Sequence, residues 1–185
     1  DRYKHGDRVK SYIIEVKKTT KGPQILVSRT HPGLLKRLFE LEVPEIHDGI
    51  VEIKSVAREP GMRSKIAVYS RDEDIDPVGS CVGHKGMRVQ TIVDELKGEK
   101  IDIVKWNADP VKYIANSLSP AKVLSVEVNE IEKVSKVIVP DYQLSLAIGK
   151  EGQNARLAAK LTGWKIDIKS ESQAAQEMDE ITSEV

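Results

Sequence analysis

The sequence contains one short glycine motif twice, and this repeat limits the possible folds more than any other feature. Gly-His-Lys-Gly occupies residues 83–86, and Gly-Lys-Glu-Gly occupies residues 149–152. An apolar residue precedes each copy, a helix-like stretch follows it, and a Lys-Ile-Asp-Ile run comes next, at residues 100–103 and 165–168. A single G-x-x-G is close to noise, but two copies with the same flanks at nearly the same interval indicate a tandem repeat. We therefore expect two small domains with the same fold.

The composition excludes several classes of protein. At 185 residues the chain can hold two or three small domains. Its single cysteine, Cys81, excludes an internal disulfide, and no apolar run is long enough to span a membrane. The four histidines show no spacing typical of a metal site. We therefore expect a cytoplasmic protein that needs neither a metal nor another cofactor.

The charged residues are distributed unevenly along the chain. The net charge is zero, which by itself argues against a nucleic-acid partner. However, residues 1–40 are strongly basic, whereas residues 171–185 carry acidic side chains and no lysine or arginine. This polarity indicates a binding site for a polyanion on the body of the protein, with a tail that could screen it. The abrupt start at Asp1 indicates a fragment of a longer protein.

The N-terminal segment predicts two strands joined by a turn. β-rich runs cover residues 8–16 and 24–29, and Thr-Lys-Gly-Pro separates them at residues 20–23. Two strands cannot form a stable sheet alone, so this hairpin must either pack on another part or belong to a truncated barrel. A helix is predicted over residues 34–41, where four leucines and Phe39 form an apolar stripe.

Both repeats predict the same order of elements, α-β-β-α-α-β. The first repeat continues from the helix at 34–41 with strands at 50–56 and 65–69, helices at 77–83 and 87–97, and a strand at 100–106. The second repeat has a helix at 110–118, strands at 123–128 and 136–139, helices at 141–149 and 153–161, and a strand at 164–169. Asp76, Asp109 and Asp141 are the predicted helix caps. Only Asn107 and Ala108 separate the two repeats.

The glycine turn has a physical use that suits a phosphate. Glycine at both outer positions permits unusual backbone angles and lets another chain approach closely. The helix that follows directs its free N–H groups and the positive end of its dipole at the turn. For a single copy, the alternative to a phosphate-binding role is a purely structural one, in which the glycines only form a tight corner between two helices. A nucleotide-binding P-loop or a dinucleotide fingerprint fits worse, because neither copy ends in Gly-Lys-Ser/Thr or follows a strand.

This order of elements resembles the type II, or prokaryotic, form of the KH domain. The resemblance implies an α+β fold in which each G-x-x-G turn clamps the backbone of single-stranded nucleic acid. The predicted RNA-binding residues are those of the two turns and the helix starts that follow them: Gly83, His84, Lys85, Gly86, Arg88, Gly149, Lys150, Glu151, Gly152, Gln153, Asn154 and Arg156.

Several other residues have a chemical interpretation and a structural one. Cys81 is predicted to be a small core residue, because Ala147 takes its place in the second copy. His84 has no recurring acidic or nucleophilic partner, so a phosphate or base contact is favoured over catalysis. Trp106 and Trp164 could stack on bases, but packing at the domain junction is favoured. Glu151 would repel a phosphate placed directly over it, so either it points away or the second turn binds more weakly.

Longer stretches of the sequence resemble the NusA family of bacterial transcription elongation factors. They are Gly-Asp-Arg-Val at 6–9, Thr-Lys-Gly-Pro-Gln at 20–24, Ser-Arg-Thr-His-Pro-Gly-Leu-Leu at 28–35, and Gly-Gln-Asn-Ala-Arg-Leu-Ala-Ala at 152–159. The similarity extends to about Ser170. It implies the end of an S1 domain, a partial OB-type β-barrel, at residues 1–30. It further implies a first KH domain at 31–106, a second at 107–170, and an acidic tail at 171–185, expected to be disordered or a loose helix.

The resemblance implies a protein that is not an enzyme. It would bind nascent single-stranded RNA and RNA polymerase, act with other Nus-type factors, and modulate pausing, termination and antitermination, as a monomer in the cytoplasm. Three alternatives remain: an RNA-targeting appendage of a phosphorolytic exoribonuclease, a KH-type ribosomal RNA-binding protein, and a protein-interaction module with vestigial KH clefts. In the exoribonucleases a single KH domain precedes S1, which is the opposite of the order seen here.

Overall fold

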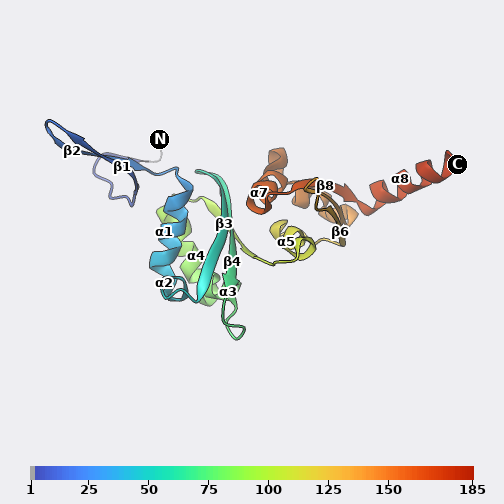
Figure 1. Cartoon of the computed structure of the whole chain (residues 1–185), viewed down its shortest axis with the longest axis horizontal. Coiled ribbons are helices and arrows are strands. Elements are labelled where there is room, and N and C mark those ends of the chain that lie inside the picture. Colours follow the sequence, from blue (N-terminus) through green and yellow to red (C-terminus); the bar gives the residue numbers. More distant parts are fainter. Residues whose placement is uncertain (1–2) are drawn as a thin grey trace.

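The computed structural model describes residues 3–185 and shows an α+β fold with two three-stranded sheets, each accompanied by its own helices (Figure 1). Asp1 and Arg2, which begin the predicted S1 segment and the basic head, lie outside the described residues. A hairpin of β1 (Tyr12–Thr19) and β2 (Gly22–Ser28) lies at one end of the molecule, and the C-terminal helix extends from the other end.

The first KH unit confirms the predicted order of elements. It consists of α1 (Pro32–Glu42), the short α2 (Pro44–His47), β3 (Val51–Glu59), β4 (Arg63–Ser70), α3 (Pro77–Val82), α4 (Met87–Glu95) and β5 (Lys100–Lys105). The strand order in the sheet is β3-β4-β5, with β3 antiparallel and β5 parallel to the central strand β4.

The second KH unit repeats this architecture. It consists of α5 (Pro110–Ser117), β6 (Ser125–Asn129), β7 (Val134–Val139), α6 (Leu144–Ile148), α7 (Gln153–Thr162) and β8 (Lys165–Ser170). Its sheet has the order β6-β7-β8, again with one antiparallel and one parallel pair. Three-residue 3-10 helices, η1 (His84–Gly86) and η3 (Lys150–Gly152), join the helix pairs, and η2 (Asp141–Gln143) precedes α6.

The predicted helix caps are confirmed at two of three positions. The carboxylates of Asp76 and Asp109 accept hydrogen bonds from the second residue of α3 and α5 at 3.1 and 3.0 Å, each with a proline at the first helical position. Asp141 is different. Its carboxylate accepts from the backbone N–H of Ser172 at 3.0 Å and from the Ser172 hydroxyl, and α6 begins without a side-chain cap. The prediction of Asp141 as a helix cap is therefore wrong, because this side chain is directed at the start of the C-terminal helix.

The acidic tail forms a helix, α8 (Glu171–Ser183), which is one of the two forms expected for it. Ser170 and Gln173 form a capping box at its start, with each side chain bonded to the other residue's backbone N–H. An ion pair between Lys169 and Glu177 adds a further link to β8. Most of the helix is exposed and extends away from the second KH unit (Figure 1).

The hairpin is held against the first KH unit by a network around Arg29. The Arg29 guanidinium donates to the side chain of Glu95 at 3.0 Å and to its backbone carbonyl at 2.7 Å. Arg58 in turn donates to the carbonyls of Arg29 and His31, and its guanidinium pairs with the buried carboxylate of Glu99. The Ser-Arg-Thr-His junction is therefore a structural connector. The described residues of the predicted S1 segment form only this two-stranded sheet, without a barrel.

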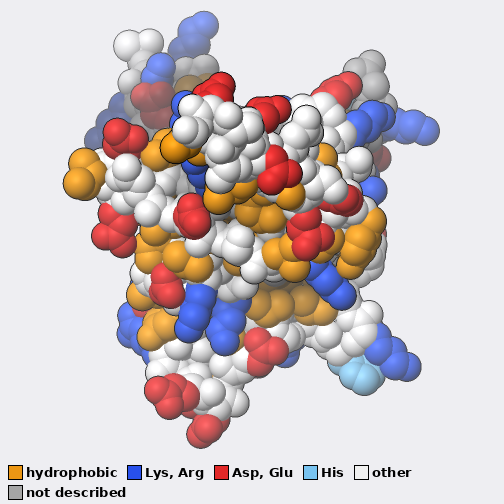
Figure 2. Space-filling model, turned by 90° about the vertical axis from the view of Figure 1, so that its right-hand side faces the viewer, with side chains coloured by type: hydrophobic (Ala, Val, Ile, Leu, Met, Phe, Trp, Pro, Cys, Tyr) orange, Lys and Arg blue, Asp and Glu red, His pale blue; other side chains and the backbone are white. Residues whose placement is uncertain are grey.

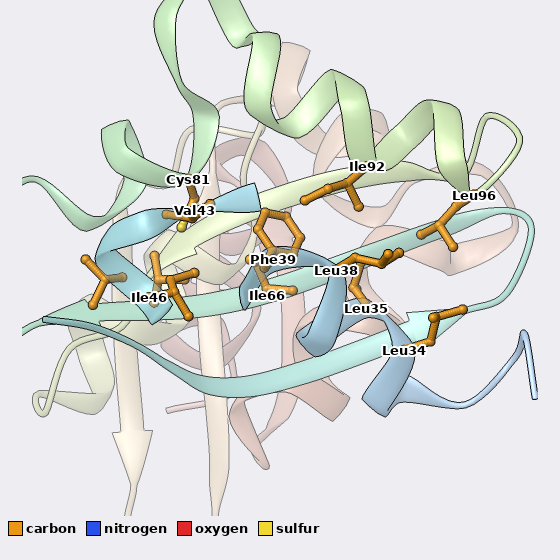
Figure 3. Packing of buried hydrophobic residues seen from close by; sticks show 12 residues of the cluster. Leu34, Leu35, Leu38, Phe39, Val43, Ile46, Ile66, Cys81, Ile92 and Leu96 are labelled. Atoms are coloured by element: carbon orange, nitrogen blue, oxygen red, sulfur yellow. The ribbon is translucent and has the colours of Figure 1, made fainter. Parts of the chain in front are cut away.

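The core of the first unit lies between α1, α4 and the sheet. Leu34, Leu35, Leu38 and Phe39 of α1 pack with Ile92 of α4, with Leu96 just after α4, and with Ile66 of β4 (Figure 3). Leu41, which was predicted to share this stripe, is exposed. Cys81 is fully buried in this cluster, as predicted, and Ala147 takes the matching place in the second core. Burial raises the pKa of the Cys81 thiol to about 12, so the thiol is protonated and unreactive at neutral pH.

The second KH unit covers the outer face of the first sheet. A buried cluster joins Ala57, Ala67 and Val104 from the sheet to Tyr113, Leu157 and Leu161 from α5 and α7, with Trp106 packed beside it. This second layer explains why β4 is buried on both of its faces. Trp106 thus lies at the domain junction, as predicted. Trp164 does not, because it is buried in the second unit's own core.

A buried charged pair lies within this junction. The Lys65 ammonium group is 3.0 Å from Asp102 Oδ2 and donates to the carbonyl of Ser119, a residue of the second unit, at 2.6 Å. Arg63 also donates to both oxygens of Asp102, at 2.9 and 2.8 Å. Lys65 is fully buried, so its charge depends on these partners.

The same pair makes the junction sensitive to acid. Burial opposes ionisation of Asp102, but the hydrogen bonds from Arg63 and the charge of Lys65 outweigh it and lower the pKa of this carboxyl. Burial lowers the pKa of Lys65, and Asp102 offsets part of that change. Because the folded pKa of Asp102 lies below its unfolded value of about 3.9, its stabilisation is complete above that pH and is lost as the pH falls through the folded value.

We predict that Asp102→Asn destabilises the protein by about 3 kcal/mol, because it leaves the buried Lys65 without its counter-charge. Asp167→Asn is the matched control. Asp167 lies opposite Lys136 in the second sheet, in the register position that Asp102 has opposite Lys65 in the first. Its side chain is 57% exposed, and its ion pair is with Lys169, at 3.9 Å. We expect that control to change stability by less than about 0.5 kcal/mol. Urea unfolding of the two variants measures the difference, and equal losses would contradict the buried-pair account.

Candidate nucleic-acid interface

The first glycine turn, residues 83–86, has a backbone that only glycine-rich sequences adopt readily. We call it the first clamp. Gly83 follows the last residue of α3 at φ 78° and ψ 175°, a region open essentially to glycine alone. Lys85 and Gly86 are left-handed, with φ of 52° and 74°, and α4 begins at the next residue. The turn therefore brings the C-terminus of α3 and the N-terminus of α4 together at one exposed corner.

The second turn, residues 149–152, has the same backbone and is called the second clamp. Gly149 has φ 80° and ψ 168°, Glu151 has φ 56°, and Gly152 has φ 74°. It joins α6 to α7 in the same way. The predicted repetition of the glycine motif is thus a repetition of local geometry.

The two glycines of each clamp have different physical roles. A Cβ on Gly83 would lie 2.6 Å from Arg88 Cγ, and one on Gly149 would lie 2.7 Å from the backbone nitrogen of Asn154. The first glycine therefore allows the helix to pack directly on the turn. The second glycine has open space around it, with nothing within 4 Å at Gly86, and is needed for its left-handed backbone.

The variable positions of both clamps present their side chains to solvent. His84 and Lys85 are exposed in the first clamp, and Lys150 and Glu151 are exposed in the second. Lys85 and Glu151 occupy the same left-handed position, so the two clamps carry opposite charges there. The structure thus brings the predicted basic residues to the corners where a phosphate would approach.

Arg88 and Asn154, which occupy equivalent positions, are engaged with the protein. The Arg88 guanidinium donates to Glu45 at 2.9 Å and to the carbonyl of Ser80 at 2.8 Å, and so ties α4 to α2 and α3. The Asn154 side chain is buried, with 5% exposure, and donates to the carbonyls of Leu118 and Ala147. The structure thus places Asn154 inside the domain and not on the predicted RNA-binding surface. Gln153 is partly buried at the first position of α7.

The surroundings of the clamps limit where a polyanion can lie. A hollow of about 610 Å³ beside the first clamp is lined in part by the carboxylates of Glu42, Glu45 and Asp76, which disfavour phosphate there. Lys, Arg, Asp and Glu side chains alternate across the face of the molecule at the α8 end (Figure 2). This face therefore offers no broad basic surface to a nucleic acid.

Both repeats match known domain families. Residues 29–106 match the NusA-like first KH domain, and residues 110–176 match the NusA-like second KH domain. The chain belongs to the NusA family. Its fold is also similar to the crystal structure of APE1850, with a TM-score of 0.53, 24% identity, and coverage of 73% of this chain and 95% of that one. At that identity the likeness shows the fold alone.

Relatives from several bacteria share this NusA-type pair of domains. The chain is 75% identical to the transcription termination/antitermination proteins NusA of Halalkalibacterium halodurans and Bacillus subtilis, over 94% of its length. It is 55% identical to that of Mycobacterium tuberculosis strain H37Rv over 92% of its length. These matches cover 46%, 47% and 49% of the relatives. The chain therefore spans about half the length of these NusA proteins.

Residues 3–185 contain neither a cluster of metal ligands nor a membrane-spanning helix. Within this range, no group of three or more His, Cys, Asp and Glu side chains is arranged to hold a metal ion. The helices of the same range are too short or too polar to cross a membrane.

We predict that Gly149→Ala destabilises the protein more than Gly152→Ala. The added methyl group at Gly149 would meet the backbone of Asn154, which cannot move aside, so we expect a loss of about 3 kcal/mol. At Gly152 the space is open, and the left-handed backbone alone should cost about 1 to 2 kcal/mol. Thermal unfolding followed by circular dichroism compares the two. A larger loss at Gly152 would show that steric contact is not what the first glycine avoids.

Proposed function

We propose that this chain is the RNA-binding part of a NusA-type transcription factor. Its two KH domains bind nascent single-stranded RNA, while the longer protein contacts RNA polymerase and other Nus-type factors to modulate pausing, termination and antitermination. The observation that carries this proposal is the pair of clamps with matching backbone geometry on one packed body. The naming of the relatives as termination/antitermination proteins supports it.

The clamp geometry suits a sugar–phosphate backbone better than a base sequence. Each clamp offers an approach without a Cβ at its second glycine, the positive end of the following helix, and at least one exposed lysine. Such contacts position a strand without reading its sequence. Any sequence preference would come from contacts to the bases in the neighbouring groove. The chain thus acts as a binding protein and not as an enzyme.

The packed junction supports simultaneous use of both clamps. A KH clamp holds about four nucleotides, so a strand crossing both needs roughly twice that length plus any bridging bases. Because α5 and α7 already lie on the first sheet, the second engagement is intramolecular and requires little further ordering.

The remaining assignments extend the same proposal. Residues 1–30 are the end of an S1 domain, 31–106 and 107–170 are the two KH domains, and 171–185 is an acidic tail in the form of α8. The protein acts in the cytoplasm as a monomer and needs no cofactor.

Replacing His84 and Lys85 by aspartate tests this function. The first clamp would lose its cation and gain two carboxylates, so we expect at least about a tenfold loss of affinity for a single-stranded RNA of about ten nucleotides. Folding should be nearly unchanged, because both side chains are exposed and aspartate tolerates the left-handed backbone of residue 85. Fluorescence anisotropy measures the affinity, and circular dichroism measures the melting temperature.

A matched control separates a local clamp from general electrostatics. Lys160→Asp with Lys165→Gln changes the net charge by the same amount at exposed positions outside both clamps. We expect this control to retain nearly the wild-type affinity apart from a small effect of net charge. Equal losses in the two double variants would refute a clamp at residues 83–86.

A further inference from the structure

The second clamp is held from outside its own domain. The guanidinium of Arg156 donates through Nη1 to the carbonyl of Glu151 at 3.0 Å, inside the clamp. Through Nε and Nη2 it donates to Oε1 of Glu59 at 3.1 and 2.6 Å. A Cβ on Gly152 would lie 4.0 Å from Arg156 Nη1, so the guanidinium lies directly beside the second glycine. One side chain therefore links the clamp to the last residue of β3 in the first KH unit.

The first clamp has no such link among the described residues. Gln90 stands where Arg156 stands in the repeat, and its amide donates to Asp94 on its own helix at 2.8 Å. The open space around Gly86 shows that no side chain lies against that glycine. The two clamps share a backbone, but only the second is fastened to the other domain.

Glu59 is placed to fix Arg156 and little else. Its side chain is 18% exposed, and its second oxygen, Oε2, is buried without a hydrogen-bond partner among residues 3–185. Glu59 is partly buried and Arg156 is 42% exposed, so the pair acts mainly through geometry: two hydrogen bonds to the same carboxylate oxygen fix the orientation of the guanidinium group. Arg156 donates to Glu59 through Nε and Nη2 and to Glu151 through Nη1, so its planar group bridges the two residues. A lysine has no such fixed set of donors.

We propose that Glu59 is a positioning residue for RNA binding by the second clamp. It orients Arg156, and Arg156 holds the carbonyl of Glu151 so that the clamp is ordered before RNA arrives. The first KH domain thereby completes the RNA site of the second. This inference rests on the proposed function, because it assumes that the second clamp binds RNA phosphate. It assigns Arg156 a bracing role in place of the direct RNA contact predicted from the sequence.

The bracing has a consequence for affinity and for salt dependence. Without Glu59 the turn would have to become ordered during binding, which weakens affinity without removing a phosphate contact. The number of contacts sets the slope of affinity against salt, so that slope should stay the same. If Arg156 were instead a phosphate ligand restrained by Glu59, its release would strengthen binding and steepen the slope.

The experiment uses the full chain with Glu59→Gln and, as its matched control, Glu52→Gln. Glu52 lies on the same strand, and its exposed ion pair with Arg71 is confined to the first KH domain. Anisotropy titrations with a single-stranded RNA of about ten nucleotides are run over a range of salt concentrations. We expect Glu59→Gln to bind about fivefold more weakly than Glu52→Gln, with the same salt slope. Amide hydrogen exchange at residues 149–152 should be faster in Glu59→Gln alone.

Arg156→Lys provides a second variant that keeps the charge. Because lysine cannot bridge Glu59 and the Glu151 carbonyl together, it should lose affinity to a similar extent. Wild-type binding by Arg156→Lys, equal binding by the two glutamine variants, or tighter binding by Glu59→Gln would each overturn the inference. Failure of the proposed function looks different: the wild-type chain would then not bind the RNA at all, or would bind it independently of His84 and Lys85.

Discussion

The packing of the second KH domain on the outer face of the first domain's sheet governs the rest of the structure. The central strand β4 is buried on both faces because α5 and α7 cover the side that its own helices leave open. The hydroxyls of Ser55 on β3 and Tyr113 on α5 both donate to the carbonyl of Leu161 near the end of α7, at 2.8 and 3.2 Å. The Ser55 bond ties α7 to the sheet, and the Tyr113 bond ties it to α5. Because only Asn107 and Ala108 separate the domains, this contact sets the position and orientation of the two clamps relative to each other.

The same sequence pattern has different physical roles in the two repeats. In the first sheet, Lys65 and Asp102 form a buried pair that also binds the Ser119 carbonyl of the neighbouring domain. In the second sheet, Lys136 and Asp167 keep the same register but lie at an exposed surface. Both repeats therefore keep the same Lys–Asp register between two strands, but only in the first repeat is that pair covered by the neighbouring domain. The effect of a substitution on stability should differ between the two repeats for this reason.

Local features were predictable from the sequence, whereas contacts between distant segments were not. Short-range sequence signals were enough for the glycine turns, the caps at Asp76 and Asp109, and the order of strands and helices. The occurrence of the same signals in both repeats strengthened these predictions. Asp141 looked like a third cap, but Ser172 competes for its carboxylate after the chain has folded back. Trp164 looked like a junction residue, but the second core had room for it.

The candidate site shows the same division. The exposed positions of both clamps were found from the motif, because a turn is a local structure. The buried Asn154 was not distinguished from an RNA ligand, since its partners Leu118 and Ala147 belong to other elements. Glu59 gave no signal in the sequence at all, because its partner Arg156 lies in the other repeat and only the domain packing brings them together.

The central claim is that both KH domains form one rigid body in the free chain. Residual dipolar couplings of the backbone amides, measured without RNA, test it most directly, because they report the orientation of each domain independently. The account predicts that a single alignment tensor fits residues 32–105 and 110–170 together. Two tensors of different magnitude would show that the domains reorient, and would contradict an RNA surface that is aligned before binding.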